Sequence, residues 1–296
     1  MRLTSATHTN AHQYTGCTWT FVQVRPELAL YNPHPHCLSF SNEEAQRHAM
    51  DKAVKSLLGR LAKVATKLTP RKVMEGEVIP LMASHIGGEP YAEIGEPWPA
   101  CPTCKTDLTF ICQIDTASGF HEKPKGIDLF TFFYCWECSP WGLGDEMKGT
   151  WVVRTYSDPN EVFAKPIRPS EQQPDPPEFC LLVPAKVNSF PDWEDVGSKA
   201  FETFSEINED EPWEAYEAAV KSLGGETDFC TLVGGYPNWI QGKDTPVCDL
   251  CHSRMNLLAQ IDSETEAGLM WGDSGCLYLF HCVNHPRDVR LLLQCF

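Results

Sequence analysis

Eight residues of the sequence have the types and spacing of metal ligands. Two Cys-x-x-Cys pairs come first, Cys101 with Cys104 and Cys135 with Cys138. A second group follows at an offset of 147 residues and has histidine at the fourth position: Cys248, Cys251, Cys282 and His285. Structural zinc takes four sulfur or imidazole ligands in a tetrahedron, commonly from two short knuckles. The spacing therefore predicts two structural zinc ions, one for each group.

The change from cysteine to histidine at the fourth position favours a metal over a set of buried thiols. Imidazole is the ordinary replacement that preserves a tetrahedral zinc site. Buried free thiols without a metal are the alternative, and His252 and His281 are competing ligands in the second group. Four protein ligands leave no coordination position open, so we expect structural rather than catalytic sites.

Both groups lie in a longer repeat that runs without a gap. The stretch CPTCKTDLTFICQID, residues 101–115, aligns with CDLCHSRMNLLAQID, residues 248–262. Upstream, GGEP at residues 87–90 aligns with GGYP at residues 234–237. One constant offset over about 50 residues indicates an internal duplication.

The other shared residues have structural interpretations. The paired glycines of the GGxP turns predict positive φ angles or a close approach of the backbone. Gln113 and Gln260 lie in apolar stretches, so we expect buried amides that hydrogen-bond to the backbone. Asp115 and Asp262 are expected to cap the turn after the strand.

Strands and helices must position these residues. In each copy a strand ends in QID, a second strand is LFTFFYC (129–135) or CLYLFHC (276–282), and a third begins at Thr150 or Val289. These stretches are rich in aromatic and large apolar residues, as buried strands are. CLLVPAKV from Cys180 is expected to open the second half, with TFVQVRPELALY from Thr20 as its counterpart.

A helix is predicted before each copy. The first has a capping box at Ser41 and Glu44, carries apolar residues at helical spacing as far as Leu68, and stops at Thr69-Pro70. The second begins near Pro212 and ends at Gly224-Gly225.

These elements predict an α+β fold that is internally duplicated. Each mostly antiparallel β-sheet half has a packed helix and a pair of zinc knuckles, and a pseudo-twofold axis relates the halves. The predicted boundaries are an N-terminal tail over 1–17, a first repeat with zinc site 1 over 18–160, a Pro-rich linker over 161–177, and a second repeat with zinc site 2 over 178–296.

Composition narrows the class of protein. The chain has 296 residues and a net charge of −16, from 24 basic and 40 acidic residues. A binder of phosphate backbones needs a basic surface, so nucleic acid is not the expected partner. No apolar run approaches the roughly 18 residues of a membrane span, and the N-terminus lacks a signal-peptide core. We therefore expect a cytoplasmic protein whose 14 cysteines are metal ligands and buried apolar residues.

An acidic segment, residues 192–217, is the strongest feature for partner binding. It has ten acidic residues against one lysine, Lys199, and six aromatic residues lie in or next to it. Acidic surface with aromatic anchors suits capture of a basic protein. The expected partner-binding residues are Trp193, Glu209, Asp210, Glu211 and Trp213. The alternative is a solvated face with its aromatic residues in the core.

The sequence resembles the bacterial YwqG-like family of duplicated domains. The match is carried by GGxP, Trp98-Pro99, QID and MWGDSGCLYLF at residues 270–280. The first copy is also similar to the eukaryotic Tsr4 and programmed-cell-death-protein-2 group, where GGxP, Cys-x-x-Cys, Phe120-His121 and Leu-Phe-x-Phe-x-Cys recur in this order. The bacterial resemblance implies a toxin-immunity role, and the eukaryotic one implies a chaperone for a ribosomal protein.

The sequence thus predicts a non-enzymatic, zinc-stabilised protein-binding module. Its partner would be a protein, an antagonised toxin or a basic client. An enzyme is the first alternative, but no acid–base constellation repeats, and Cys112, the one tempting thiol, is replaced by Ala259 in the second copy. A zinc-ribbon protein that associates with nucleic acid is the second, through a basic patch that includes Lys52, Lys55 and Arg60.

Overall fold

The computed structural model describes residues 36–120, 123–138, 149–171, 173 and 175–296, with side chains described from residue 47 onward. Residues 48–296 form one compact unit, distinct from residues 1–47. The predicted tail over 1–17 and the strand from Thr20 lie outside the described residues. Within the part of the chain that is described, no helix has both the length and the apolar character needed to cross a membrane.

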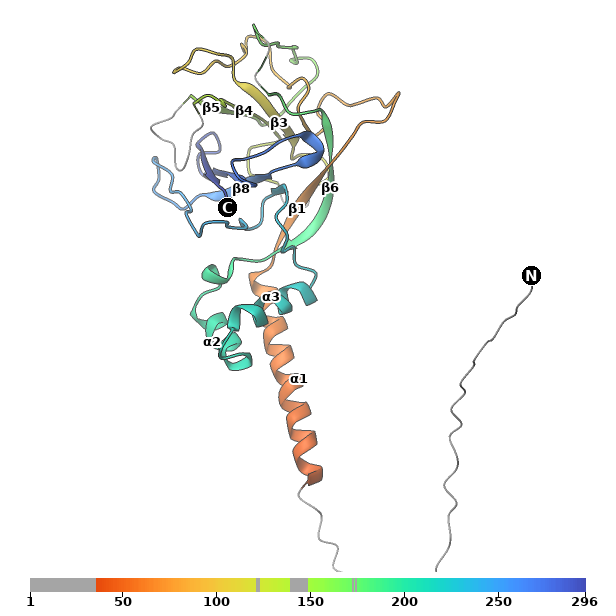
Figure 1. The fold of residues 1–296 in the computed structure, drawn as a ribbon, viewed down its shortest axis with the longest axis vertical. Helices are drawn as coiled ribbons and strands as arrows, with labels where there is room; N and C mark the ends of the chain where they lie inside the picture. The colour runs from red at the N-terminus through yellow and green to blue at the C-terminus, as the bar shows by residue number, and fades with distance from the viewer. Residues whose placement is uncertain (1–35, 121–122, 139–148, 172, 174) are drawn as a thin grey trace, which may run out of the picture. The chain divides into compact units, whose positions relative to one another are not determined.

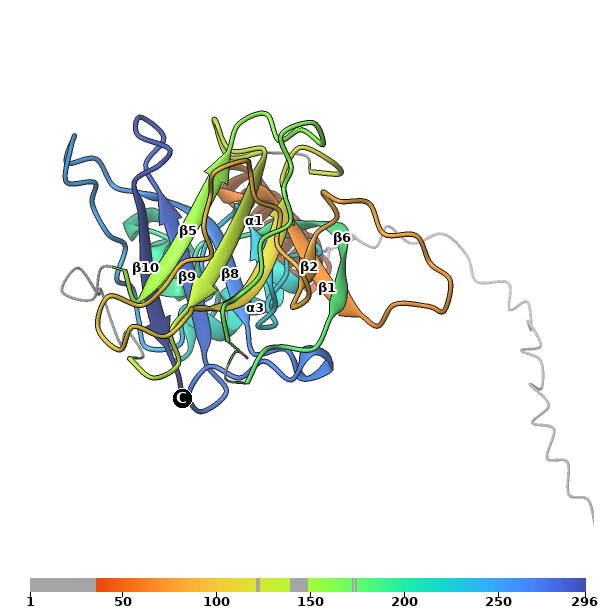
Figure 2. The same cartoon turned by 90° about the horizontal axis from the view of Figure 1, so that it is seen from above.

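A single ten-stranded sheet forms most of the compact unit (Figure 1). Every ladder between its strands is antiparallel, and the sheet curls into a nearly closed barrel (Figure 2). The strands are β1 (Lys63–Arg71), β2 (His85–Ile86), β3 (Thr109–Asp115), β4 (Leu129–Tyr134), β5 (Trp151–Tyr156), β6 (Cys180–Ser189), β7 (Leu232–Val233), β8 (Asn256–Asp262), β9 (Cys276–His281) and β10 (Val289–Gln294).

Alternation along the strands separates two faces of the sheet. In β9, Leu277 and Leu279 join the barrel interior, whereas Tyr278 and Phe280 join a separate apolar cluster on the outer face. Successive side chains of a strand point to opposite faces, so a buried strand must be apolar on both when both are covered. The predicted strands ending in QID, and those at 129–135, 276–282, Thr150, Cys180 and Val289, are confirmed as β3, β8, β4, β9, β5, β6 and β10.

The two halves of the sheet mirror each other: β10-β9-β8-β7-β1 from one edge corresponds to β5-β4-β3-β2-β6 from the other. The full strand order is β10-β9-β8-β7-β1-β6-β2-β3-β4-β5, with β1 and β6 at the centre. β2 pairs with β6, and β7 pairs with β1. Each outer set of four strands is therefore attached to the central strand from the other half of the chain.

Backbone contacts recur at the offset of 147 residues. Gly87 N donates to Ile111 O at 2.8 Å, and Gly234 N donates to Leu258 O at 3.2 Å. The β3–β4 ladder shifts register between Phe110 and Cys112, and the β8–β9 ladder shifts at the matching place. The GGxP glycines all have positive φ, between 63° and 81°, as predicted.

The two glutamines are confirmed as buried amides that bind the backbone. Both are fully buried. Gln113 Oε1 accepts from Tyr91 N at 2.6 Å, and its Nε2 donates to Leu81 O at 2.9 Å and Ala83 O at 3.0 Å. Gln260 Oε1 accepts from Asn238 N at 3.0 Å, and its Nε2 donates to Cys230 O at 2.8 Å. Each amide fixes the segment that precedes its own knuckle.

The first helix departs from its prediction at both ends. Helix α1 is His36–Leu61, so Ser41 lies inside it and Leu68 lies beyond it. Residues Lys63–Arg71 form β1, which pairs with β6 over its whole length. Val64 and Leu68 fit helical spacing, but burial in a ladder between two strands outweighs that local preference.

Helices α2 (Ser198–Ile207) and α3 (Pro212–Ser222) lie side by side (Figure 1). Helix α3 confirms the predicted second helix, whereas α2 was not predicted. Both pack with the last turns of α1 in a separate apolar cluster that includes Leu58, Phe204 and Tyr216. The acidic segment is therefore mostly helical.

We predict that Gly87→Ala destabilises the protein more than Gly234→Ala. Both positions have positive φ, 63° and 70°, so an L side chain is strained at each by about 1–2 kcal/mol. A Cβ at Gly87 would lie 2.3 Å from Pro177 O, whereas a Cβ at Gly234 would have no described atom within 4 Å. Urea unfolding followed by tryptophan fluorescence compares the two, and an equal loss of stability would contradict this account of Gly87.

Candidate metal centres

Each metal-ligand group begins with a tight knuckle. Cys101 N donates to Thr106 O at 2.8 Å, and Lys105 N donates to Cys101 O at 3.0 Å. Cys248 N likewise donates to Ser253 O at 3.0 Å, and His252 N donates to Cys248 O at 2.8 Å. Lys105 and His252 both have positive φ, 68° and 55°. This turn holds both cysteines of each pair on one side of the loop.

The sheet explains why about 30 residues can separate the two pairs of each group. The first pair precedes β3 or β8, and the second follows β4 or β9. Since β3 pairs antiparallel with β4, and β8 with β9, the start of one strand lies beside the end of the next. Both knuckles therefore meet at the same edge of each hairpin.

The ligand atoms lie at the separations that a tetrahedral ion requires. In the first group, Cys101 Sγ is 3.6 Å from Cys138 Sγ, and Cys104 Sγ is 3.6 Å from Cys135 Sγ. All four sulfurs lie within 4.8 Å of one another. An ion with bonds of about 2.3 Å to sulfur places two tetrahedral sulfurs about 3.8 Å apart. The first group can hold such an ion.

The second group has the same arrangement with imidazole as the fourth ligand. Cys251 Sγ is 3.5 Å from Cys282 Sγ. His285 Nδ1 is 3.4 Å from Cys248 Sγ and 3.6 Å from Cys282 Sγ. A tetrahedral ion would place nitrogen and sulfur about 3.6 Å apart. The structure thus assembles all eight predicted ligands into two clusters able to hold a metal ion.

Hydroxyl groups favour the thiolate form of one cysteine in each cluster. Cys104 Sγ lies 2.9 Å from Thr106 Oγ1, and hydrogen bonds from Thr106 lower the pKa of Cys104 to about 6. Hydrogen bonds from Ser253 lower the pKa of Cys251 to about 5. Burial raises the pKa of Cys248 to about 12. A bound cation deprotonates such a thiol, so the charge that burial disfavours would be offset by the metal.

Apolar side chains of the outer sheet face pack against both clusters. Around the first cluster pack Leu108, Phe110, Phe133 and Trp98, whose Nε1 donates to Leu108 O at 2.8 Å. Around the second pack Trp239, Met255, Tyr278 and Phe280. The metal ligands thus form the outer layer over each hairpin, which would otherwise expose large apolar side chains to water.

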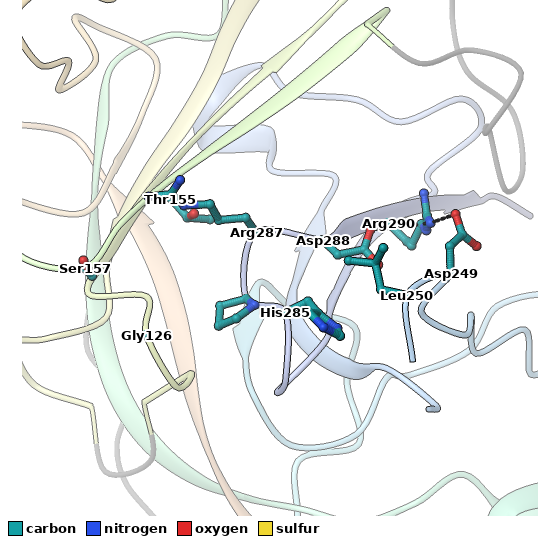
Figure 3. A pocket seen from close by; sticks show the side chains of 10 residues that line it. Gly126, Thr155, Ser157, Asp249, Leu250, His285, Arg287, Asp288 and Arg290 are labelled. Carbon is teal, nitrogen blue, oxygen red and sulfur yellow. Dashed lines mark hydrogen bonds and ion pairs between the residues drawn. The ribbon is translucent and has the colours of Figure 1, made fainter. Parts of the chain in front are cut away.

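A cavity of about 690 Å³ lies beside the second cluster (Figure 3). Thr155 and Ser157 line one side, and His285 and Asp288 line the other. Arg290 pairs with Asp249, next to Cys248, and its guanidinium nitrogen lies 3.5 Å from Asp288 Oδ1. This arginine therefore links the first knuckle to the segment that follows the second knuckle.

The competing ligands lie outside the clusters. Neither His252 nor His281 belongs to the second cluster. Cys112 belongs to the barrel interior, and burial raises its pKa far above the ordinary value. Burial in an apolar interior makes a thiol unreactive.

The predicted partner-binding residues lie on and between the helices. Glu209, Asp210 and Glu211 are exposed in the α2–α3 loop. Trp213 is 42% exposed. Trp193 is partly buried, and its ring contacts those of Phe201, Phe204 and Tyr216.

One protein family has a sequence model that matches the chain. The model of a family described as Domain of unknown function (DUF1963) matches residues 84–283. The chain belongs to this family. The matched region runs from the end of the segment before β2 to just beyond β9, so it contains every cluster ligand except His285. A comparison with curated proteins finds no match for the chain.

We predict about two metal ions per chain, one in each closed tetrahedral cluster. Cys104→Ala should lose one ion and lower the melting temperature sharply, because such sites contribute folding free energy directly. His285→Cys should keep both ions, since it recreates the ligands of the first cluster. Metal analysis with thermal unfolding tests both variants. The control is Cys295→Ala, because Cys295 is half-buried and lies outside both clusters. Wild-type protein with clearly less than one ion per chain would contradict the assignment.

Proposed function

We propose that this DUF1963 member is a non-enzymatic, zinc-stabilised cytoplasmic module that binds a basic protein. The observation that carries the proposal is an acidic cavity at the base of the α2–α3 helices. The cavity measures about 310 Å³. Its acidic lining residues are Asp192, Glu217, Glu226 and Asp228.

The cavity also has the aromatic walls that hold cationic side chains. Trp193, Tyr216, Phe229 and Trp239 line it. An aromatic face attracts an ammonium or guanidinium group within about 6 Å of its ring centroid. Lys221 lines the same cavity, and Glu226 is engaged by Lys67 at 2.9 Å. The remaining carboxylates and rings suit the insertion of one arginine or lysine.

The acidic segment extends this recognition surface. Glu209, Asp210 and Glu211 are exposed at the far end of α2. Phe201 and Trp213 are 52% and 42% exposed, and each is apolar surface on an acidic face. Charge at the rim steers a basic partner, and exposed aromatic side chains supply the energy of contact.

Zinc is the metal that fits the donor sets best. Four thiolates, or three thiolates with one imidazole, in a closed tetrahedron are typical of structural zinc. Cys–His donors without oxygen ligands argue against magnesium and calcium. With four protein ligands on each ion, the zinc would stabilise the fold and take no substrate.

We further propose that the two halves arose by duplication, as in the YwqG-like proteins that the motifs resemble. The mirrored strand order and the recurring contacts at one offset support this. The resemblance favours two kinds of basic partner, a toxin that the protein neutralises or a client that it chaperones. Both would be recognised by the same acidic face.

The alternative functions have weaker support. Metal catalysis would need an open coordination position, and four protein ligands in each cluster would leave none. Cys112 is buried in the core, which does not suit a nucleophile. A nucleic-acid role would rest on Lys52, Lys55 and Arg60, which are exposed on α1 as the solvated face of that helix.

We predict that reversing the charge of Glu209, Asp210 and Glu211 to lysine slows association with a basic partner recovered by pull-down. Folding should be unaffected because the three side chains are exposed. Association rates measured by surface plasmon resonance at rising salt provide the test, since screening acts within about 8 Å at 0.15 M. The matched control reverses Glu75, Glu161 and Glu171, which are exposed outside the acidic segment. Equal association rates for both triple variants would refute the acidic face as the binding surface.

The two tryptophans should respond differently. Trp213→Ala should speed dissociation of the same partner with little effect on stability, because the ring is exposed. Trp193→Ala should lower the melting temperature, because its ring packs against three aromatic side chains. If Trp213→Ala leaves the dissociation rate unchanged, the ring is not an anchor.

A further inference from the structure

Residues from both halves of the chain line a cavity of opposite charge. It measures about 270 Å³. Three lysines line it, Lys63 at the start of β1 and Lys123 and Lys125 in the loop before β4. Asn256 and His281, paired across β8 and β9, complete its polar lining. Basic groups thus gather at one place in a chain of net charge −16.

The corresponding place in the other half is filled by aromatic side chains. The positions 147 residues before His281 and Val283 are Tyr134 and Trp136, and Trp271 stands 147 residues after Pro124. Trp271 packs on Tyr134 at 5.2 Å and on Trp136 at 5.3 Å between ring centroids. His281, Val283 and Pro124 are smaller and leave the cavity between them.

His281 is the residue in this cavity that most needs a ligand. It is 3% exposed, and no group in the described part of the chain forms a hydrogen bond with its Nδ1. A buried polar atom without a hydrogen-bond partner destabilises the fold. Alternation along β9 turns His281 to the inner face, away from Tyr278 and Phe280, which join the cluster around the metal ligands.

The lysines add positive charge around this buried nitrogen. The ammonium of Lys63 lies 4.0 Å from the centroid of the Tyr236 ring. Lys123 Nζ is 2.7 Å from Asp128 Oδ1, so one carboxylate lies near the rim. Lys125 is exposed beside it. All three lysines line the cavity, so their ammonium groups can reach a ligand bound in it.

We propose that this cavity binds a small molecule through a phosphate group. Phosphate can accept hydrogen bonds from the lysine ammonium groups, from the Asn256 amide and from the ring N–H of neutral His281 in the tautomer that carries its hydrogen on Nδ1. At about 270 Å³ the cavity is slightly smaller than the about 300–1,000 Å³ typical of pockets for drug-sized ligands. It has room for phosphate and a small substituent. None of the residues that line this cavity lines the acidic cavity or belongs to a metal cluster, although His281 and Val283 flank the ligand Cys282 in the sequence.

The experiment titrates the full chain with inorganic phosphate at low ionic strength by isothermal titration calorimetry. A parallel titration with acetate tests whether a carboxylate binds as well. We expect saturable binding of phosphate and at least tenfold weaker binding of acetate. The double variant Lys123→Gln, Lys125→Gln should weaken phosphate binding at least tenfold, because it removes two of the three ammonium groups that line the cavity. Exposed Lys52 supplies the control, Lys52→Gln, which should bind as the wild type does.

A second variant fills the cavity as the other half does. His281→Tyr with Val283→Trp should abolish phosphate binding, and metal analysis and thermal unfolding will show whether the fold is kept. The lysine double variant tests the site even if this one fails to fold. No saturable phosphate binding by the wild type, equal binding by the lysine variant, or acetate binding as tight as phosphate would overturn the proposal.

Discussion

The ladder between β1 and β6 is the constraint on which the rest of the structure depends. It joins nine residue pairs, from Lys63 with Ser189 to Arg71 with Leu181. β2 is attached to β6 and β7 to β1, so each hairpin that carries a metal cluster is anchored to a strand from the other half of the chain. The interior cluster of the barrel draws on both halves. Neither half can complete its own sheet.

The barrel interior covers only one face of the metal-bearing hairpins, and the loops that carry the metal ligands cover the other. Strands β4 and β9 are buried along their whole length, so they need apolar neighbours on both faces. The interior covers one face of each. The Cys-x-x-Cys and Cys-x-x-His knuckles cover the other face, together with Trp98 on one hairpin and Trp239 on the other. These loops have few hydrophobic residues of their own. A bound ion can fix such a loop in place, and without the ion a larger hydrophobic core would be needed.

The sequence revealed the parts of the structure that local chemistry determines. Ligand spacing, GGxP and QID predicted the clusters, the positive-φ turns and the buried glutamines. β1 was missed because its apolar residues continue the helical period of α1, and only the distant β6 shows that they form a strand. Helix α2 was missed because its acidic residues hide a short stripe formed by Ala200 and Phe204. The lysine-lined cavity needs distant segments to meet, which no local pattern reports.

Two closed metal centres are the central claim, and X-ray absorption at the metal edge tests it most directly. If the eight cluster residues hold two zinc ions, the ligand atoms around zinc are sulfur and nitrogen in the ratio seven to one. The zinc–sulfur distances should be about 2.3 Å and the zinc–nitrogen distances about 2.0–2.1 Å. His285→Cys should convert the shell to sulfur alone. A shell rich in oxygen, or one that His285→Cys leaves unchanged, would contradict the account.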